Sequence, residues 1–419
     1  MKISVILLLG ENEKNNQKTI DNLVDCKKSF SGEIEVLAYA PKKKGRKDYK
    51  LGERAQICFS DLSFDSDIQA YQDAISRATG DWITMLRSGD TWSLETLSNL
   101  VDSVKAYPEQ QILMLKKQMP DGSIGAFAKD ALAKEPTIMR LQKKYSCYPF
   151  YFGGTFLKLP YIRDRRFHPE YGLEAERAYF LDLCGDVKQV LFLPDSVYHS
   201  FKAQEGDHTF FADIYEVDWY TKSLEEFWLP YLEQWKQRRG EVPPLIQFHL
   251  VFTLRCRLLS NLNNLNKHVI PEGEEETCLK KMGQLLAYVD DNILFNCLKL
   301  SECSMTESFK WILGVLKYGD EYRFKKQYVN GMVHFGGGDT VLNRIFNLKT
   351  NILFMNYEDG YLHIDGTIHP ILYSMADEVY LMFGSEKYKL PYNGRYTLTK
   401  VFGVSIYKGH SFHIALPMA

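Results

Sequence analysis

Short apolar runs alternate with amphipathic stretches through the first two hundred residues of the chain. The nearly uninterrupted apolar run at residues 3–9 predicts a buried strand of the kind found in parallel sheets, and residues 33–39 predict a second strand. Between them, residues 15–26 place Ile20 and Leu23 on one face of a helix. A strand, a helix and a strand in this order imply a parallel sheet with a right-handed crossover.

The alternation continues to about residue 205. Amphipathic periodicity predicts helices at residues 66–79 and 94–107. Apolar runs predict further strands at residues 57–59, 81–86, 111–116, 190–193 and 196–199. We therefore expect an α/β domain over residues 1–205.

Beyond residue 205 the pattern becomes helical and then β-like. Residues 224–235 and 245–262 have the strongest helical periodicity, and Gly336–Gly338 is typical of a hinge or linker. After these glycines, short β-branched or alternating runs are separated by turn signals such as Asp359-Gly360. This spacing predicts a helical domain over residues 206–335 and a small all-β domain, sandwich-like or Ig-like, over residues 336–419.

Length and composition agree with several domains of a globular protein. A chain of 419 residues exceeds one ordinary core, so two or three domains are expected. Its 45% hydrophobic and 25% charged residues fit an ordered protein rather than a disordered one. The net charge of −2, from 51 basic and 53 acidic residues, argues against nucleic acid as the main partner, because nucleic-acid binding usually needs a basic face.

Cysteine spacing and apolar run length set limits on location. The eight cysteines include no Cys-x-x-Cys pair, so neither a zinc site nor a disulfide framework is expected. The N-terminal apolar run is too short to cross a membrane, and no later run approaches the required length. We expect a cytoplasmic protein, with peripheral contact at the inner face of the membrane left open.

The richest chemistry lies in residues 70–92. They predict a helix, a tight turn at Gly80-Asp81, a buried strand and then the loop Ser88-Gly89-Asp90. This order, and the Thr91-Trp92 that follows, resembles the metal and nucleotide-sugar site of the inverting family-2 glycosyltransferases, which have the GT-A fold. Those enzymes usually carry two or three aspartates here, whereas this loop retains Asp90.

The resemblance implies a nucleotide-sugar donor and a divalent metal, Mn²⁺ or Mg²⁺, which prefers carboxylate oxygens. It implies that Asp90 contacts the metal and the donor, with Ser88 and Glu11 as further donor contacts. His199, after the last strand of the domain, is a second candidate metal ligand, although a lone histidine is more often a packing or surface residue. Asp90 also precedes a predicted helix and could be partly structural.

The resemblance also implies a general base near residue 174. Glu174 matches the position of the glutamate in the Glu-Asp pair of the family, and Ala175 replaces the aspartate. Glu176 is near enough to substitute for the missing aspartate, although its position on the helix points its side chain in a different direction from that of residue 175. The alternative is a pair of exposed glutamates favoured by the helix dipole.

Aromatic residues are expected to shape the acceptor side, because aromatic faces suit sugars. The candidates are Trp92 and the loop that contains Tyr151 and Gly153. The basic residues 42–47 occupy the place of the nucleobase-binding turn of the family and are interpreted as a solvated loop.

Two functions are compatible with these residues. The first is inverting, metal-assisted transfer of a sugar to a glycan or polyol-phosphate acceptor, as in capsule and teichoic-acid synthesis proteins. Residues 243–257 and 351–366 resemble later segments of those proteins. The second is a catalytically degenerate GT-A-like module that binds glycan or a partner synthase. The reduced acidic motif motivates the second.

Overall fold

The computed structural model of the chain describes residues 1–40, 55–59, 67–122, 124, 135–141, 152–201, 215–263, 269–296, 307–338, 340–348, 350–375 and 378–418. The chain divides into two compact units. The first comprises Met1–Asp213 and Pro243–Ile246, and the second comprises Ile214–Val242 and Gln247–Ala419. Every helix in the described ranges is too short or too polar to cross a bilayer.

The first unit is built on one mixed sheet with helices on both sides. Its strands are β1 Lys2–Leu8, β2 Glu33–Tyr39, β3 Ala55–Phe59, β4 Trp82–Arg87, β5 Thr91–Trp92, β6 Ile112–Gln118, β7 Thr137–Arg140, β8 Thr155–Lys158 and β9 Gln189–His199. Its helices are α1 Glu13–Lys28, α2 Asp67–Arg77, α3 Thr96–Ala106, α4 Leu159–Ile162, the 3₁₀ helix η2 Pro169–Glu174 and α5 Ala175–Asp186.

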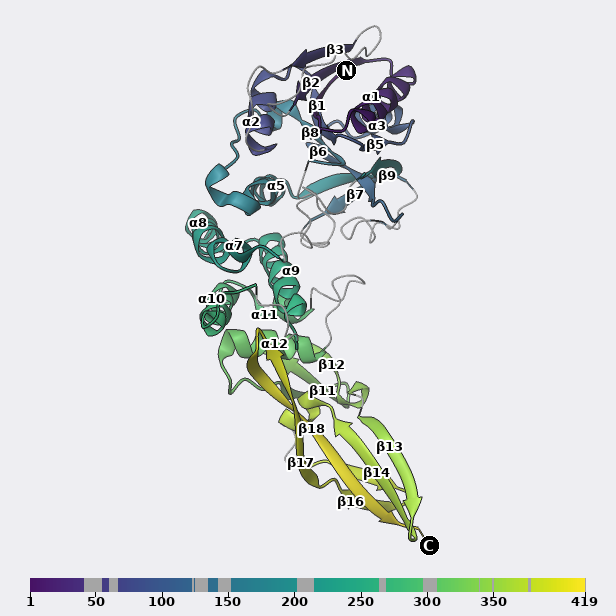
Figure 1. The fold of residues 1–419 in the computed structure, drawn as a ribbon, viewed down its shortest axis with the longest axis vertical. Helices are drawn as coiled ribbons and strands as arrows, with labels where there is room; N and C mark the ends of the chain where they lie inside the picture. Colours follow the sequence, from purple (N-terminus) through teal and green to yellow (C-terminus); the bar gives the residue numbers. More distant parts are fainter. Residues whose placement is uncertain are drawn as a thin grey trace. The chain divides into compact units, whose positions relative to one another are not determined.

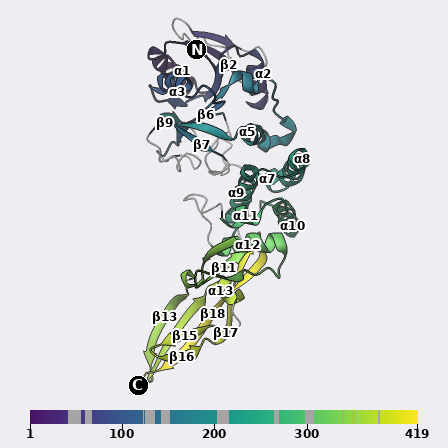
Figure 2. The same cartoon turned by 180° about the vertical axis from the view of Figure 1, so that it is seen from behind.

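Within the described residues the strand order is β3-β2-β1-β4-β8-β6-β9-β5, with β7 paired to β9. Strands β3, β2, β1 and β4 are parallel, as the strand–helix–strand pattern predicted. Strand β8 is antiparallel to both β4 and β6. Helices α1 and α3 cover one side of this sheet, and α2 and α5 lie on the other (Figures 1 and 2).

Alternation along β1 explains how the sheet is held. Ile3, Val5 and Leu7 point to the same side and belong to a buried cluster that includes apolar residues of α1 and α3. The sheet is thereby anchored by burial on the side away from α2, and burying an aliphatic side chain contributes about 1.5–3 kcal/mol. The pairing of β1 with β4 runs from Ile3 opposite Trp82 to Leu8 opposite Arg87, so the carboxyl ends of the two strands are held side by side.

The second unit contains the remaining helices and strands, apart from residues 244–246 at the start of α9, which belong to the first unit. Its helical elements are α7 Val217–Tyr220, the π-helical η3 Ser223–Trp228, α8 Leu229–Arg239, α9 Pro244–Ser260, α10 Glu275–Leu286, α11 Asp291–Asn296, α12 Glu307–Tyr318, the 3₁₀ helix η5 Ile345–Asn347 and α13 Pro370–Met375. Its strands are β10 Lys325–Val329, β11 Met332–Gly337, β12 Thr340–Arg344, β13 Asn351–Glu358, β14 Tyr361–Ile368, β15 Tyr380–Phe383, β16 Glu386–Lys389, β17 Tyr392–Val401 and β18 Val404–Pro417.

The strands of the second unit form three antiparallel sheets in the described part of the chain, with orders β10-β11-β12, β13-β14-β18-β17 and β15-β16. The expectation of a hinge at Gly336–Gly338 is wrong. Gly336 and Gly337 are buried in β11, and a Cβ on Gly336 would lie 2.0 Å from the backbone oxygen of Thr340. The predicted boundary between residues 335 and 336 thus falls inside a strand, and the division into three domains stays a prediction.

Candidate functional site

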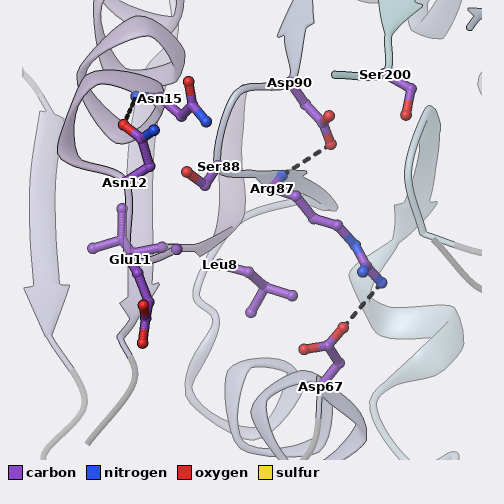
Figure 3. Close-up of a pocket in the computed structure, with 11 residues that line it drawn as sticks. Leu8, Glu11, Asn12, Asn15, Asp67, Arg87, Ser88, Asp90 and Ser200 are labelled. Carbon is purple, nitrogen blue, oxygen red and sulfur yellow. Dashed lines mark hydrogen bonds and ion pairs between the residues drawn. The ribbon is translucent and has the colours of Figure 1, made fainter. Parts of the chain in front are cut away.

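A pocket of about 360 Å³ lies where β1 and β4 end. The two strands are parallel neighbours with Leu8 opposite Arg87, so the chain leaves both at the same edge of the sheet. Ligands of open α/β sheets bind at such carboxyl ends. The described residues that line the pocket, drawn in Figure 3, are Leu8, Leu9, Gly10, Glu11, Asn12, Asn15, Asp67, Arg87, Ser88, Asp90 and Ser200.

The loop after β1 is fixed by two asparagines. The Asn16 side chain donates to the carbonyl oxygen of Gly10 at 3.0 Å and accepts from its N–H at 2.9 Å. Asn12 caps α1, because its Oδ1 accepts from the N–H groups of Lys14 and Asn15 at 3.0 and 3.3 Å. This cap starts the helix at Glu13, two residues before the predicted start, and aims its N-terminal end at the pocket.

The loop after β4 depends on Gly89. Gly89 has φ of +95°, and a Cβ there would lie 2.5 Å from the ring of Phe201. Its N–H donates to Oγ1 of Thr19 at 2.8 Å. A side chain at this position would therefore displace the loop that carries Ser88 and Asp90.

The carboxylate of Asp90 is bonded to the surrounding chain. Asp90 is 4% exposed, and its Oδ1 accepts from the N–H of Phe201 at 2.8 Å. Its Oδ2 accepts from the hydroxyl of Tyr198 and from the N–H of Arg87 at 3.3 Å. Asp90 lines the pocket, and the same contacts tie its loop to the end of β9; its predicted contact with a donor stays a prediction.

Arg87 and Asp67 also line the pocket, although neither was expected there. The Nη2 of Arg87 lies 3.0 Å from Oδ2 of Asp67 and donates to the hydroxyl of Tyr71 at 3.0 Å. Burial raises the pKa of Tyr71, whereas the charge of Arg87 lowers it. The sequence signal was a basic residue at the end of a buried strand, directly before Ser88.

Glu174 and Glu176 are both buried, so their interpretation as exposed helix-start residues is wrong. Glu174 is fully buried, with its Oε2 2.9 Å from Nη1 of Arg177. Glu176 is 6% exposed and accepts from the N–H of Phe152 at 2.8 Å. Neither is among the residues that line the pocket, and the general-base role of either stays a prediction.

The remaining predicted residues lie outside the pocket lining. Trp92 is 2% exposed and packs against Phe156 with ring centroids 5.6 Å apart. Gly153 is buried against Tyr198. These positions give no support to direct contact with an acceptor. Tyr151 and the basic residues 42–47 lie outside the described residues.

The predicted metal ligands are Asp90 and His199. His199 pairs with Thr91 at the end of β9, and burial followed by the charge of Lys18 lowers its pKa. The oxygens of Asp90 already accept three hydrogen bonds from the chain. The described ranges contain no group of three or more histidine, cysteine or acidic side chains arranged to hold a metal. The donor set therefore does not fit a divalent cation bound by Asp90 and His199.

Comparison with known proteins places the fold. No protein-family model matches the chain, and no curated protein matches its sequence. Residues 1–349 of Staphylococcus aureus TarS in complex with UDP-GlcNAc match with a TM-score of 0.50 and 13% identity, covering 82% of this chain and 99% of that one. A longer TarS structure matches with a TM-score of 0.49 and 13% identity, covering 99% of this chain and 72% of that one.

A third similar structure is the mannosyltransferase PcManGT from Pyrobaculum calidifontis in complex with GDP-Man and Mn²⁺. Its TM-score is 0.38 at 12% identity, with 62% of this chain and 73% of that one covered. At these identities the matches concern the fold alone, and the match to TarS 1–349 is the one that supports it. The first unit has the GT-A-type α/β fold that the sequence predicted.

Proposed function

We propose that this chain is a glycosyltransferase that binds a nucleotide-sugar donor in the pocket at the ends of β1 and β4. The observation that carries the proposal is the convergence of Glu11, Ser88, Asp90 and Arg87 on one pocket of a GT-A-type domain. The pocket also includes Asn12 and Asn15 from the start of α1, where the helix dipole favours negative charge. A donor diphosphate is such a charge.

The donor class is proposed from the comparison with TarS 1–349, whose structure contains UDP-GlcNAc. We take a UDP-sugar as the first donor to test. Inverting transfer would form one bond, from the acceptor hydroxyl to the anomeric carbon, as the bond to the diphosphate breaks. A carboxylate base takes the hydroxyl proton. Glu174 and Glu176 remain the proposed candidates, and a glycan or polyol phosphate remains the proposed acceptor.

Binding is tested by thermal unfolding of the full chain with UDP-GlcNAc, other UDP-sugars and GDP-mannose, each with and without Mn²⁺. A ligand that binds only the folded state at about 100 times its Kd stabilises by about 2.7 kcal/mol. Asn15→Ala, inside the pocket, should reduce the stabilisation. Gln17→Ala, exposed on the next turn of α1, is the matched control and should not. The proposal is wrong if no donor in the panel raises the unfolding temperature.

One observation favours the second candidate, a binding module without turnover. The carboxylate of Asp90 is used in holding the fold, as its three hydrogen bonds show. Donor hydrolysis and transfer to glycan acceptors separate the two candidates. Release of nucleoside diphosphate supports the transferase, whereas donor binding with no release over many hours supports the binding module.

A further inference from the structure

We propose that Arg87 supplies the positive charge that holds the donor diphosphate, so that donor binding does not require a divalent cation on Asp90. This inference rests on the proposed function and gives it a specific chemistry. It follows from where Arg87 lies, from the positive charge that it brings to the described lining of the pocket, and from the contacts that already use the oxygens of Asp90.

Arg87 is the last residue of β4 and stands opposite Leu8 of β1. Its side chain runs along the pocket toward Asp67 at the start of α2, as Figure 3 shows. Among the described residues that line the pocket, Glu11, Asp67 and Asp90 carry carboxylates and Arg87 carries the positive charge. Within the described part of the lining, the guanidinium of Arg87 is therefore the positive charge that a diphosphate would meet, and it lies at the sheet edge.

The chemistry of the guanidinium suits this role. It presents five N–H donors in a plane, which matches the oxygens of phosphate groups in a bidentate arrangement. The contacts to Asp67 and Tyr71 are both made through Nη2 and hold the plane in one orientation. Tyr71 is fully buried, so this support is rigid.

The ion pair with Asp67 is weak enough to be exchanged. The side chains of Arg87 and Asp67 are 22% and 39% exposed, so water screens their attraction in part. Asp67 offers one carboxylate oxygen to Nη2, whereas a diphosphate offers several charged oxygens to the other N–H groups of the guanidinium as well. A diphosphate that accepts two or more of these bonds can therefore displace the carboxylate of Asp67.

The competing explanation is that Arg87 only fixes α2, because Asp67 and Tyr71 both belong to that helix. Asp67 separates the two explanations. If Arg87 only fixes α2, removing the charge of Asp67 should harm the pocket in the same way as removing Arg87. If Arg87 binds diphosphate, removing that charge takes away a competitor and leaves the cation in place.

The experiment is calorimetric titration of the full chain with UDP, GDP, CDP and ADP and with their monophosphates, in EDTA and in Mn²⁺. Wild-type protein should bind at least one of these four nucleoside diphosphates in EDTA. Arg87→Met should weaken the binding of that diphosphate by about 10–100-fold, or about 1.4–2.7 kcal/mol, and the binding of its monophosphate by clearly less, because the charge-assisted bonds of the guanidinium are lost. Arg87→Lys should retain part of the affinity, and Asp67→Asn should equal or exceed wild type.

The failures are distinguishable. Binding of a diphosphate only in the presence of Mn²⁺ overturns the role of Arg87 and leaves the proposed function standing. Equal losses for Arg87→Met and Asp67→Asn, with diphosphate and monophosphate affected alike, overturn it in favour of a structural role. If no nucleotide binds wild-type protein in either condition, the proposed function fails and the inference fails with it.

Discussion

The hydroxyl of Tyr198 donates a hydrogen bond to Oδ2 of Asp90, joining the loop after β4 to strand β9 across 108 residues of sequence. Tyr198 is 2% exposed and Asp90 is 4% exposed, so the bond is shielded from water. The N–H of Phe201 binds the other carboxylate oxygen at 2.8 Å. Asp90 is therefore part of the framework of the pocket, whatever it also contacts in a bound donor.

Asp90→Asn should destabilise the first unit. Both carboxylate oxygens of Asp90 accept hydrogen bonds in the wild-type protein. An amide has one acceptor oxygen, so the NH₂ group of the asparagine must face a group that donates to the wild-type carboxylate. We expect the free energy of unfolding to fall by about 1–3 kcal/mol. Urea unfolding measures the loss, and amide hydrogen exchange locates it at the loop after β4 and at the end of β9. Asp102→Asn, exposed on α3, is the matched control and should cost less than about 0.5 kcal/mol. Equal stability of the two variants would contradict the role of Asp90 in the fold.

Gly153→Ala should act through Tyr198. An ideal Cβ at residue 153 would lie 2.9 Å from the Tyr198 hydroxyl oxygen and 3.1 Å from Cζ. The hydroxyl must then move away from Asp90, and overpacking of this kind costs about 1–3 kcal/mol. In a Tyr198→Phe background the nearest atom is gone, so the same substitution should cost less by at least about 0.5 kcal/mol. Strict additivity in this double-mutant cycle, measured by urea unfolding, would show that residue 153 acts elsewhere.

The sheet of the first unit could be predicted because its strands are buried on both faces. The run at residues 3–9 is apolar apart from Ser4, and the run at residues 33–39 is apolar after Glu35; the structure has β1 and β2 there. The buried face of helix α5 could not be predicted in the same way. It buries Glu176 and Arg177 together with its apolar residues, so no polar stripe distinguishes an outer face.

The strands before residue 336 were missed although a local signal was present. Asn330 and Gly331 both have positive φ, of 48° and 72°, and connect β10 to β11 as a two-residue hairpin turn. Asn-Gly is the preferred pair for such a turn. The turn at Asp359-Gly360, with φ of 49° and 82°, is of the same kind and was recognised.

The ion pair of Arg87 with Asp67 could not be predicted, because it joins the end of β4 to the start of α2 through a tertiary contact.

Truncating two leucines of the same antiparallel sheet should have very different effects. Leu353 on the edge strand β13 is 67% exposed, whereas Leu416 on the central strand β18 is fully buried in the cluster with Phe412 and Ile414. We expect Leu416→Ala to cost about 2–5 kcal/mol and Leu353→Ala less than about 0.5 kcal/mol. Urea unfolding of the full chain measures both. Comparable losses would mean that β13 is covered in solution.

His249 should make the second unit sensitive to acid. It is fully buried on α9 beside Trp228, and burial, followed by the charge of Arg257, lowers its pKa to about 3. Because this value lies below the ordinary pKa of about 6.5, the unfolded chain binds more protons between the two values. The stabilisation is therefore present above pH 6.5 and is lost as the pH falls toward 3. From pH 7 to pH 5 the contribution of this residue should fall by about 2 kcal/mol.

The measurement is urea unfolding at pH 5, 6, 7 and 8 for wild type and His249→Gln, with hydrogen exchange of α9 as the local probe. Other groups titrate in both proteins, so the difference between their pH profiles isolates His249. Below pH 6.5 we expect the free energy of unfolding of wild type to fall more steeply with pH than that of the variant. The difference in slope should correspond to the uptake of about one proton on unfolding, and the two profiles should run parallel above pH 7. Parallel profiles over the whole range would contradict the prediction, because they would mean that the pKa of His249 is the same in the folded and the unfolded chain.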